Sequence, residues 1–224
     1  VNRIQEITDR HGLKIIYDAA HTFGVQYQGT SLLNFGDIST LSFHATKLFH
    51  TIEGGALVAN DEAVAHRIMY MRNFGHKGTE DFFGLGINGK NTEMNAAMGL
   101  CVLPYVPDLI NKRRVICDRY RELLRDSGLV IPAPGEDTKY NYSYFPVLFN
   151  SEDQLLGTIK RLNENEIFPR RYFYPSLNHL PYVEYVPMPV AEDVARRVIC
   201  LPLNPELPVE DVSKISEIIC SGLR

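Results

Sequence analysis

The chain has 224 residues, a formal net charge of −4, 45% hydrophobic residues and 22% charged residues, which are ordinary values for a folded globular protein and exclude a disordered chain. The 23 basic residues are scattered, so no electrostatic footprint for nucleic acid is present. No apolar run approaches the roughly 18 residues that a membrane span needs, and we expect neither a nucleic-acid nor a membrane partner.

The first quarter of the chain predicts alternating helices and strands. An opening helix carries Val1, Ile4 and Ile7 on one face and ends at Gly12. Leu13, Ile15 and Ile16 then form a short apolar run of the kind that is buried in a parallel sheet. Further strands are expected over 37–47 and 55–60, and Asp61 caps the next helix. This order of elements predicts an α/β fold.

The rest of the chain has a different rhythm. A glycine-rich loop is expected over 74–90, and a helix from Thr92 is interrupted by Pro104 and Pro107. We expect a linker over 132–140, a strand over 142–149 and a capped helix from 151. A Pro- and Tyr-rich loop over 168–189 and a final helix from 208 follow. The sequence therefore predicts two domains, 1–110 from a large α/β domain and 111–224 as a small α/β domain.

Four polar side chains lie at or near the ends of the expected strands. Asp18 follows the first strand, at the sheet edge where α/β proteins bind ligands; a carboxylate there could hold a ring nitrogen protonated, or it could cap a turn. His21 is three residues further on. Lys47 lies between two expected strands, where burial would favour its reactive neutral amine, although it could equally reach solvent. Ser42 could donate to a phosphate or close a turn.

Four stretches resemble one known family across essentially the whole chain. They are DAAHTFG, GDISTLSFHATKLFHTIEGGALV, GINGKNTEMNAAMG and VICLPLNPELPVEDV, beginning at residues 18, 36, 86 and 198. All four are similar to the DegT/DnrJ/EryC1/StrS family. The resemblance implies a fold-type I enzyme that uses pyridoxal 5'-phosphate (PLP) and transfers an amino group from an amino acid, with glutamate expected, to a nucleotide-linked keto-deoxysugar.

The resemblance also implies roles for individual residues. Lys47 would bind the cofactor covalently and shuttle protons, and Asp18 would pair with its pyridine nitrogen. His21 would lie near the cofactor's 3-hydroxyl, and Ser42 would bind its phosphate. Asn88 matches an asparagine that reaches the cofactor of a neighbouring subunit, which implies a homodimer. The family often has arginine where Lys90 stands and a hydrophobic residue where Asn91 stands.

Several alternatives remain open from the sequence. The family's cofactor lysine lies near the middle of the chain, whereas Lys47 comes early, so we expect a C-terminal fragment that could be an inactive remnant. A PLP-dependent sugar dehydratase would have histidine in place of Lys47. A metal hydrolase could use Asp18, His21, His44 and His50, but these lack a metal-binding spacing, and no metal is expected. The four cysteines fit no zinc pattern, and with a polar opening helix they predict a cytoplasmic protein.

Overall fold

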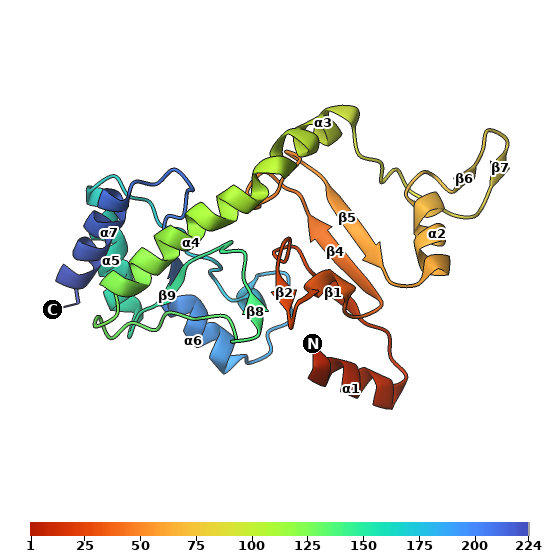
Figure 1. The fold of residues 1–224 in the computed structure, drawn as a ribbon. Helices are drawn as coiled ribbons and strands as arrows, with labels where there is room; N and C mark the ends of the chain where they lie inside the picture. The colour runs from red at the N-terminus through yellow and green to blue at the C-terminus, as the bar shows by residue number, and fades with distance from the viewer. Residues whose placement is uncertain (224) are drawn as a thin grey trace. The chain divides into compact units, whose positions relative to one another are not determined.

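The structure, a computed structural model, describes residues 1–223 and divides them into two compact units. The first unit comprises residues 1–107 and 135–141, and the second comprises residues 108–134 and everything from Tyr142 onward. Figure 1 shows the elements of both units. Within the described residues, no helix has the length and apolar character needed to cross a membrane. The two units are described separately below.

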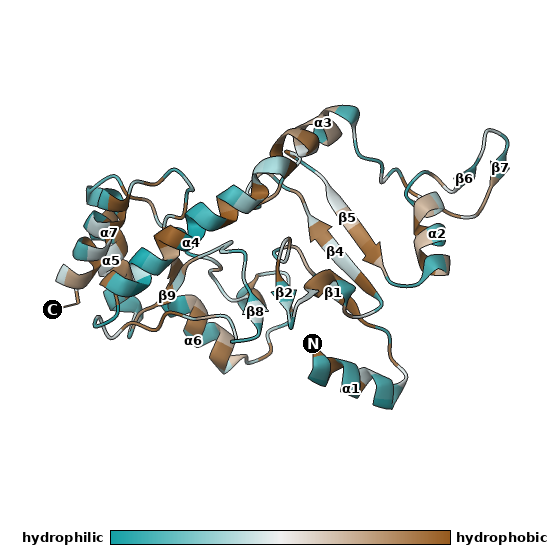
Figure 2. Ribbon diagram, in the orientation of Figure 1, coloured by the Kyte–Doolittle hydropathy of each residue, from teal (hydrophilic) through white to brown (hydrophobic). Residues whose placement is uncertain are grey.

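The first unit is built on a mixed three-stranded sheet. Strand β4 (Ile38–Ser42) lies in the middle, with β1 (Ile16–Asp18) parallel on one side and β5 (Gly55–Ala59) antiparallel on the other. Hydrophobic residues gather on β4 and β5, whereas α1 is mostly hydrophilic (Figure 2). These strands and the helices around them confirm the predicted α/β fold.

Three helices of the first unit begin or end where the sequence predicts. Gly12 ends α1 (Asn2–His11) in the left-handed conformation, with φ of 62°. The Asp61 side chain accepts hydrogen bonds from the first turn of α2 (Glu62–Met71), and Thr92 caps α3 (Glu93–Val102) in the same way. A 3₁₀ turn over Leu103–Tyr105 then precedes α4 (Val106–Leu123), as the two prolines predict.

Two stretches expected to be irregular contain short strands. The predicted linker supplies β8 (Thr138–Lys139), which pairs with β2 (Gln26–Tyr27) and extends its hairpin with β3 (Thr30–Ser31). The glycine-rich stretch forms a second hairpin from β6 (His76–Lys77) and β7 (Asp81–Phe82). Both differences arise because two-residue strands are defined by their partner and leave no periodic pattern in the sequence.

The predicted strands around the central sheet are corrected in two ways. The apolar run before Asp18 is only partly buried: Ile15 is covered, but Ile16 is 66% exposed. β1 pairs with β4 along one edge alone, so its side chains are less covered than those of a central strand. The strand expected over 37–47 ends at Ser42, and Lys47 therefore lies in a loop.

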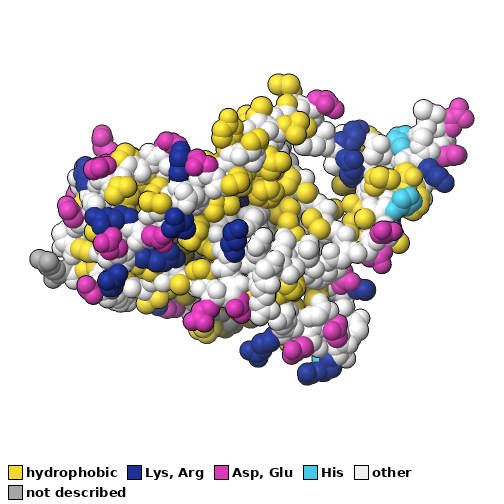
Figure 3. Space-filling view, viewed as in Figure 1, with side chains coloured by type: hydrophobic (Ala, Val, Ile, Leu, Met, Phe, Trp, Pro, Cys, Tyr) yellow, Lys and Arg dark blue, Asp and Glu magenta, His cyan; other side chains and the backbone are white. Residues whose placement is uncertain are grey.

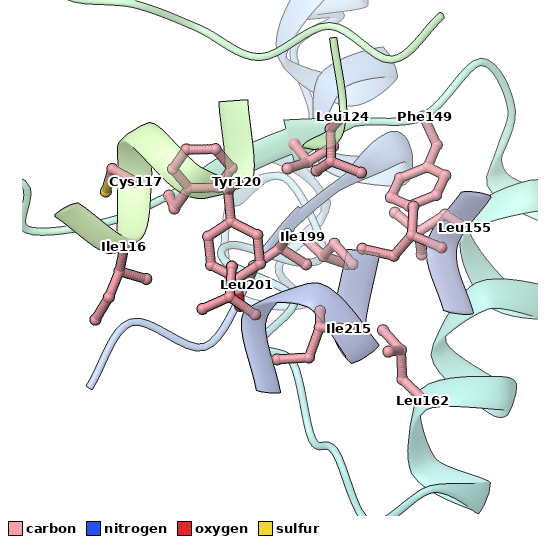
Figure 4. Packing of buried hydrophobic residues seen from close by; sticks show 14 residues of the cluster. Ile116, Cys117, Tyr120, Leu124, Phe149, Leu155, Leu162, Ile199, Leu201 and Ile215 are labelled. Carbon is pink, nitrogen blue, oxygen red and sulfur yellow. The ribbon is translucent and has the colours of Figure 1, made fainter. Parts of the chain in front are cut away.

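The second unit has a closed hydrophobic core. Strand β9 (Pro146–Leu148) pairs antiparallel with β10 (Val198–Cys200), and core residues come from these strands and the residues beside them and from α4, α5 and α7. The last three helices are α5 (Glu152–Glu164), α6 (Pro189–Arg197) and α7 (Val209–Ser221). Figure 4 shows how the buried side chains of this core pack, among them Tyr120, Phe149, Leu155, Leu162, Ile199 and Ile215. Val212, Ile215 and Ile219 are buried on one face of α7 and form an apolar stripe.

Two neighbouring leucines on α5 test this core directly. Leu155 is fully buried, whereas Leu156 is 46% exposed. We expect Leu155→Ala to lower the free energy of unfolding of the second unit by about 2–5 kcal/mol, because it leaves a cavity. Leu156→Ala is the matched control, with an expected loss of no more than about 1 kcal/mol. Urea denaturation followed by circular dichroism measures both; equal losses would contradict this description of the core.

Candidate active site

Asp18 and Ser42 lie at the same edge of the central sheet. β1 and β4 are parallel, with Asp18 opposite Thr40 in the register, so both strands end at this edge and Ser42 lies two residues beyond Thr40. The Asp18 side chain is exposed and accepts a hydrogen bond of 3.1 Å from the backbone N–H of Ala20. It therefore caps the following turn, and as a carboxylate it retains further acceptor positions for a ligand.

His21 and Lys47 come together across 26 residues of sequence. Their side-chain nitrogens, Nε2 of His21 and Nζ of Lys47, lie 2.7 Å apart. Burial and the positive charge of Lys47 lower the pKa of His21, while Asp18 opposes this shift. A neutral imidazole is therefore favoured, and its Nε2 can accept a hydrogen bond from the Lys47 ammonium group.

The loop that carries Lys47 is closed by backbone hydrogen bonds. Thr51 donates to the carbonyl of Phe43 at 2.9 Å, and Phe43 donates to the carbonyl of Gly54 at 2.8 Å. A Cβ atom at Gly55 would lie 2.6 Å from the carbonyl oxygen of Leu41, so this position requires glycine. The Gly-Gly pair that ends the loop is thus needed for the close return of the chain to β5.

Helix α3 packs against the same loop. The Asn95 side chain donates a 2.7 Å hydrogen bond to the carbonyl of Glu53. A Cβ atom at Gly99 would lie 2.9 Å from Cγ2 of Thr51, so the absence of a side chain permits the close approach of the helix. These contacts fix the Lys47 loop against α3.

Aromatic rings join the loop to the turn after Asp18. Phe23 stacks on Phe49 with ring centroids 4.5 Å apart, and Phe43 meets Phe49 edge-on at 4.9 Å. Such pairs add stability beyond the area that they bury. Because Phe49 is two residues from Lys47 and Phe23 two residues from His21, this cluster helps to hold the two functional segments together.

Two contacting residues were not found by sequence reasoning as parts of this site. The Asn141 side chain donates to the carbonyls of His21 and Phe23, both at 2.9 Å. His44, which the sequence analysis considers only for the metal-hydrolase alternative, lies with its Nε2 atom 3.6 Å from the Glu53 carboxylate and its Nδ1 atom 2.8 Å from the Thr46 hydroxyl. No local pattern marks Asn141, because its partners are about 120 residues away.

The other two predicted residues have different surroundings. The Ser42 hydroxyl accepts a long hydrogen bond of 3.4 Å from the backbone N–H of His44, which is the turn-closing role that the sequence also allows. Asn88 is exposed, and its backbone pairs with Asn73 beyond the end of α2. The structure thus groups Asp18, His21 and Lys47, places Ser42 at their sheet edge, and records contacts of Asn88 elsewhere.

A separate hollow of about 610 Å³ lies beside β4, β5 and α2. Its lining includes Thr40, Leu57, Ile68 and Arg72, but none of the five predicted site residues. Within residues 1–223, no three His, Cys, Asp or Glu side chains gather in a way that could hold a metal ion. The candidate site is therefore the Asp18–His21–Lys47 cluster, and this hollow is separate from it.

The fold is that of sugar aminotransferases. The crystal structure of DesI in the presence of its TDP-sugar product superposes with a TM-score of 0.89, at 30% identity, over 99% of this chain and 58% of that one. This similarity defines the fold. The chain belongs to the DegT/DnrJ/EryC1/StrS aminotransferase family, whose sequence profile matches residues 1–220.

Curated relatives agree with this assignment. The dTDP-4-amino-4,6-dideoxy-D-glucose transaminase of Shigella dysenteriae is 39% identical over 99% of this chain and 61% of its own length. The GDP-perosamine synthase of Escherichia coli O157:H7 is 32% identical over 98% of this chain and 61% of its own length. The chain thus spans about 61% of the length of these relatives.

The contact between His21 and Lys47 predicts a measurable titration. Replacing Lys47 by methionine removes the positive charge, so we expect the pKa of His21 to rise while remaining below its ordinary value because the ring stays partly buried. Nuclear magnetic resonance of the histidine ring measures this pKa. Lys14→Met, which removes a lysine paired with Asp37 on the surface, is the control; an equal effect of both changes would show that His21 does not sense Lys47 specifically.

Proposed function

We propose that this chain carries the catalytic lysine of a PLP-dependent enzyme that transfers an amino group from an amino acid, with glutamate expected, to a nucleotide-linked keto-deoxysugar. The observation that carries the proposal is the 2.7 Å contact between the Lys47 amine and His21, beside the Asp18 carboxylate. Membership of an aminotransferase family and the named activities of the relatives support the reaction class and the sugar substrate.

The residues present fit PLP. Lys47 offers an amine that can bond to the aldehyde, and the exposed carboxylate of Asp18 can accept a hydrogen bond from a protonated pyridine nitrogen. His21 lies next to the amine with a lowered pKa, and Ser42 offers a hydroxyl at the same sheet edge for the phosphate. When bound, PLP supplies an electron sink for the carbon that loses a proton.

The chain's own groups then have distinct tasks. The Asp18 carboxylate would favour positive charge on the ring nitrogen and so would strengthen that electron sink. His21 Nε2 holds the Lys47 amine in one orientation through their short contact. The Nζ atom of Lys47 would take and return a proton within the site. The closed loop and its contacts with α3 keep the amine at this place.

A labelling experiment tests the proposal on the full-length protein. Incubation with PLP followed by borohydride reduction and peptide mapping should place the pyridoxyl group on Lys47. In the Asp18→Asn variant we expect this label to persist while turnover falls by roughly 100-fold or more, because the electron sink is weakened.

Asp37→Asn is the matched control, since Asp37 stands at the opposite end of β4 and pairs with Lys14. Its turnover should stay within about twofold of the original. A label on Lys77 or Lys90, or near-normal turnover of Asp18→Asn, would contradict the assigned roles.

We propose further that Asn88 completes the site of a second copy in a homodimer. Leu85 and Ile87, which precede Asn88 in the segment after the β6–β7 hairpin, are 94% and 71% exposed, which is unusual for large apolar side chains. Helix α3, which follows this segment, exposes Met94 and Leu100, and hydrophobic side chains gather over it in Figure 3. Burial of this surface by a second copy would carry Asn88 toward the partner's cofactor.

Mixing two inactive variants tests whether Asn88 acts in trans. We expect Asn88→Ala and Lys47→Ala each to be inactive alone. If subunits exchange randomly, half of the dimers are mixed and each has one intact site, so activity should recover to about a quarter of the original. Glu80→Ala, a change in the neighbouring β6–β7 hairpin, takes the place of Asn88→Ala in a control mixture with Lys47→Ala. No recovery from the first mixture, with exchange shown by mass spectrometry, would mean that Asn88 does not act across subunits.

A further inference from the structure

A buried asparagine binds the segment that follows Asp18. Asn141 is 1% exposed, and its Nδ2 atom lies 2.9 Å from the carbonyl oxygens of both His21 and Phe23. An amide nitrogen has two N–H groups, so one hydrogen bond can go to each carbonyl. Two carbonyl acceptors also require the nitrogen, and not Oδ1, to face the segment.

The arrangement holds the segment from two sides. The carbonyls of His21 and Phe23 are bound by Asn141, while the Phe23 ring stacks on Phe49 of the Lys47 loop. With the backbone and one ring fixed, the His21 ring is left beside the Lys47 amine at 2.7 Å. Neither of these contacts involves a neighbour in sequence, so the tertiary fold sets the position of His21.

The backbone of Asn141 is itself fixed close to this segment. Strand β8 ends two residues earlier at Lys139 and pairs with β2, which begins three residues after Phe23. In this pairing Gln26 lies opposite Lys139. Asn141 and the segment that carries its two carbonyl partners are therefore both within a few residues of the same pair of strands. The side chain therefore needs no long reach, and its amide is presented in a defined place.

We propose that Asn141 is a positioning residue for the site, which holds the His21 ring against the Lys47 amine and thereby orients both for the cofactor. This inference rests on the proposed function for its catalytic meaning. Asn141 itself touches backbone carbonyls and not a substrate, so its effect passes through His21. The loss of its amide would leave two carbonyls without these donors and free the segment to move away from Lys47.

The test compares Asn141 with a similar asparagine elsewhere. Asn60 donates through Nδ2 to the carbonyls of Asn34 and Gly36, at 3.1 Å and 2.8 Å, and so also bridges two carbonyls separated by one residue. We compare Asn141→Asp and Asn141→Ser with Asn60→Asp and Asn60→Ser in the full-length protein. The aspartates remove the donor at constant size but add a negative charge, which by itself raises the pKa of a nearby histidine, whereas the serines add no charge; the His21 titration is therefore judged on the serine variants.

Two measurements report on position and not on folding alone. The His21 ring titration, read by nuclear magnetic resonance without cofactor, should move up toward the ordinary histidine pKa in the Asn141 variants, because the ring leaves the Lys47 charge and its partly buried site, with Asp18 the other charged group that faces it. In the complete enzyme, kcat should fall roughly 10- to 100-fold with little change in KM for the sugar. The Asn60 variants should change neither value.

Each outcome decides the proposal. It is overturned if His21 titrates as in the original protein in the Asn141 variants, or if the Asn60 variants shift His21 equally. It is also overturned if Asn141→Ser fails to fold while Asn60→Ser folds, because Asn141 would then be a folding residue. Failure of the original protein to take the PLP label on Lys47 would refute the proposed function alone, since the cofactor-free titration still judges whether Asn141 positions His21.

Discussion

The parallel pairing of β1 with β4 is the constraint on which the site depends. Two parallel strands end at the same edge of a sheet, so Asp18 and Ser42 are placed together although 24 positions separate them. β5 then returns antiparallel, and the loop between β4 and β5 must turn at this edge with Lys47 inside it. An antiparallel pairing of β1 with β4 would move the Asp18 carboxylate and the Lys47 amine to different ends of the sheet.

The loop alone does not determine the direction of the Lys47 side chain. Backbone hydrogen bonds close it, Gly55 permits the tight return, and α3 supports it through Asn95 and Gly99. The segment after Asp18 meets it through Phe23 and is held from behind by Asn141. The position of one amine therefore rests on four segments of chain, the kind of support that precise catalytic geometry requires.

The two units differ in how completely they bury their apolar residues. The second has a continuous core around Tyr120, Phe145 and Ile199 that solvent does not reach. The first leaves Ile16 and Leu57 of its sheet 66% and 52% exposed, besides Leu85 and Ile87 of the hairpin segment. Large apolar side chains left exposed in this number often mark places where another chain segment or subunit packs. The relatives, of which the chain spans about 61%, have further sequence that could serve this purpose.

Local patterns in the sequence determined much of this protein. Caps such as Asp61 and Thr92, the terminating Gly12 and the stripe on α7 act within a few residues, so the helices were predictable. The SFHATK and EGG motifs led to Lys47 and the family through resemblance. Only the tertiary structure decided the burial of β1 and the pairing of β8. It also decided the contact of His21 with Lys47 and the hydrogen bonds that Asn141 donates to the segment after Asp18. They join residues up to 120 positions apart, and no local propensity specifies a distant partner.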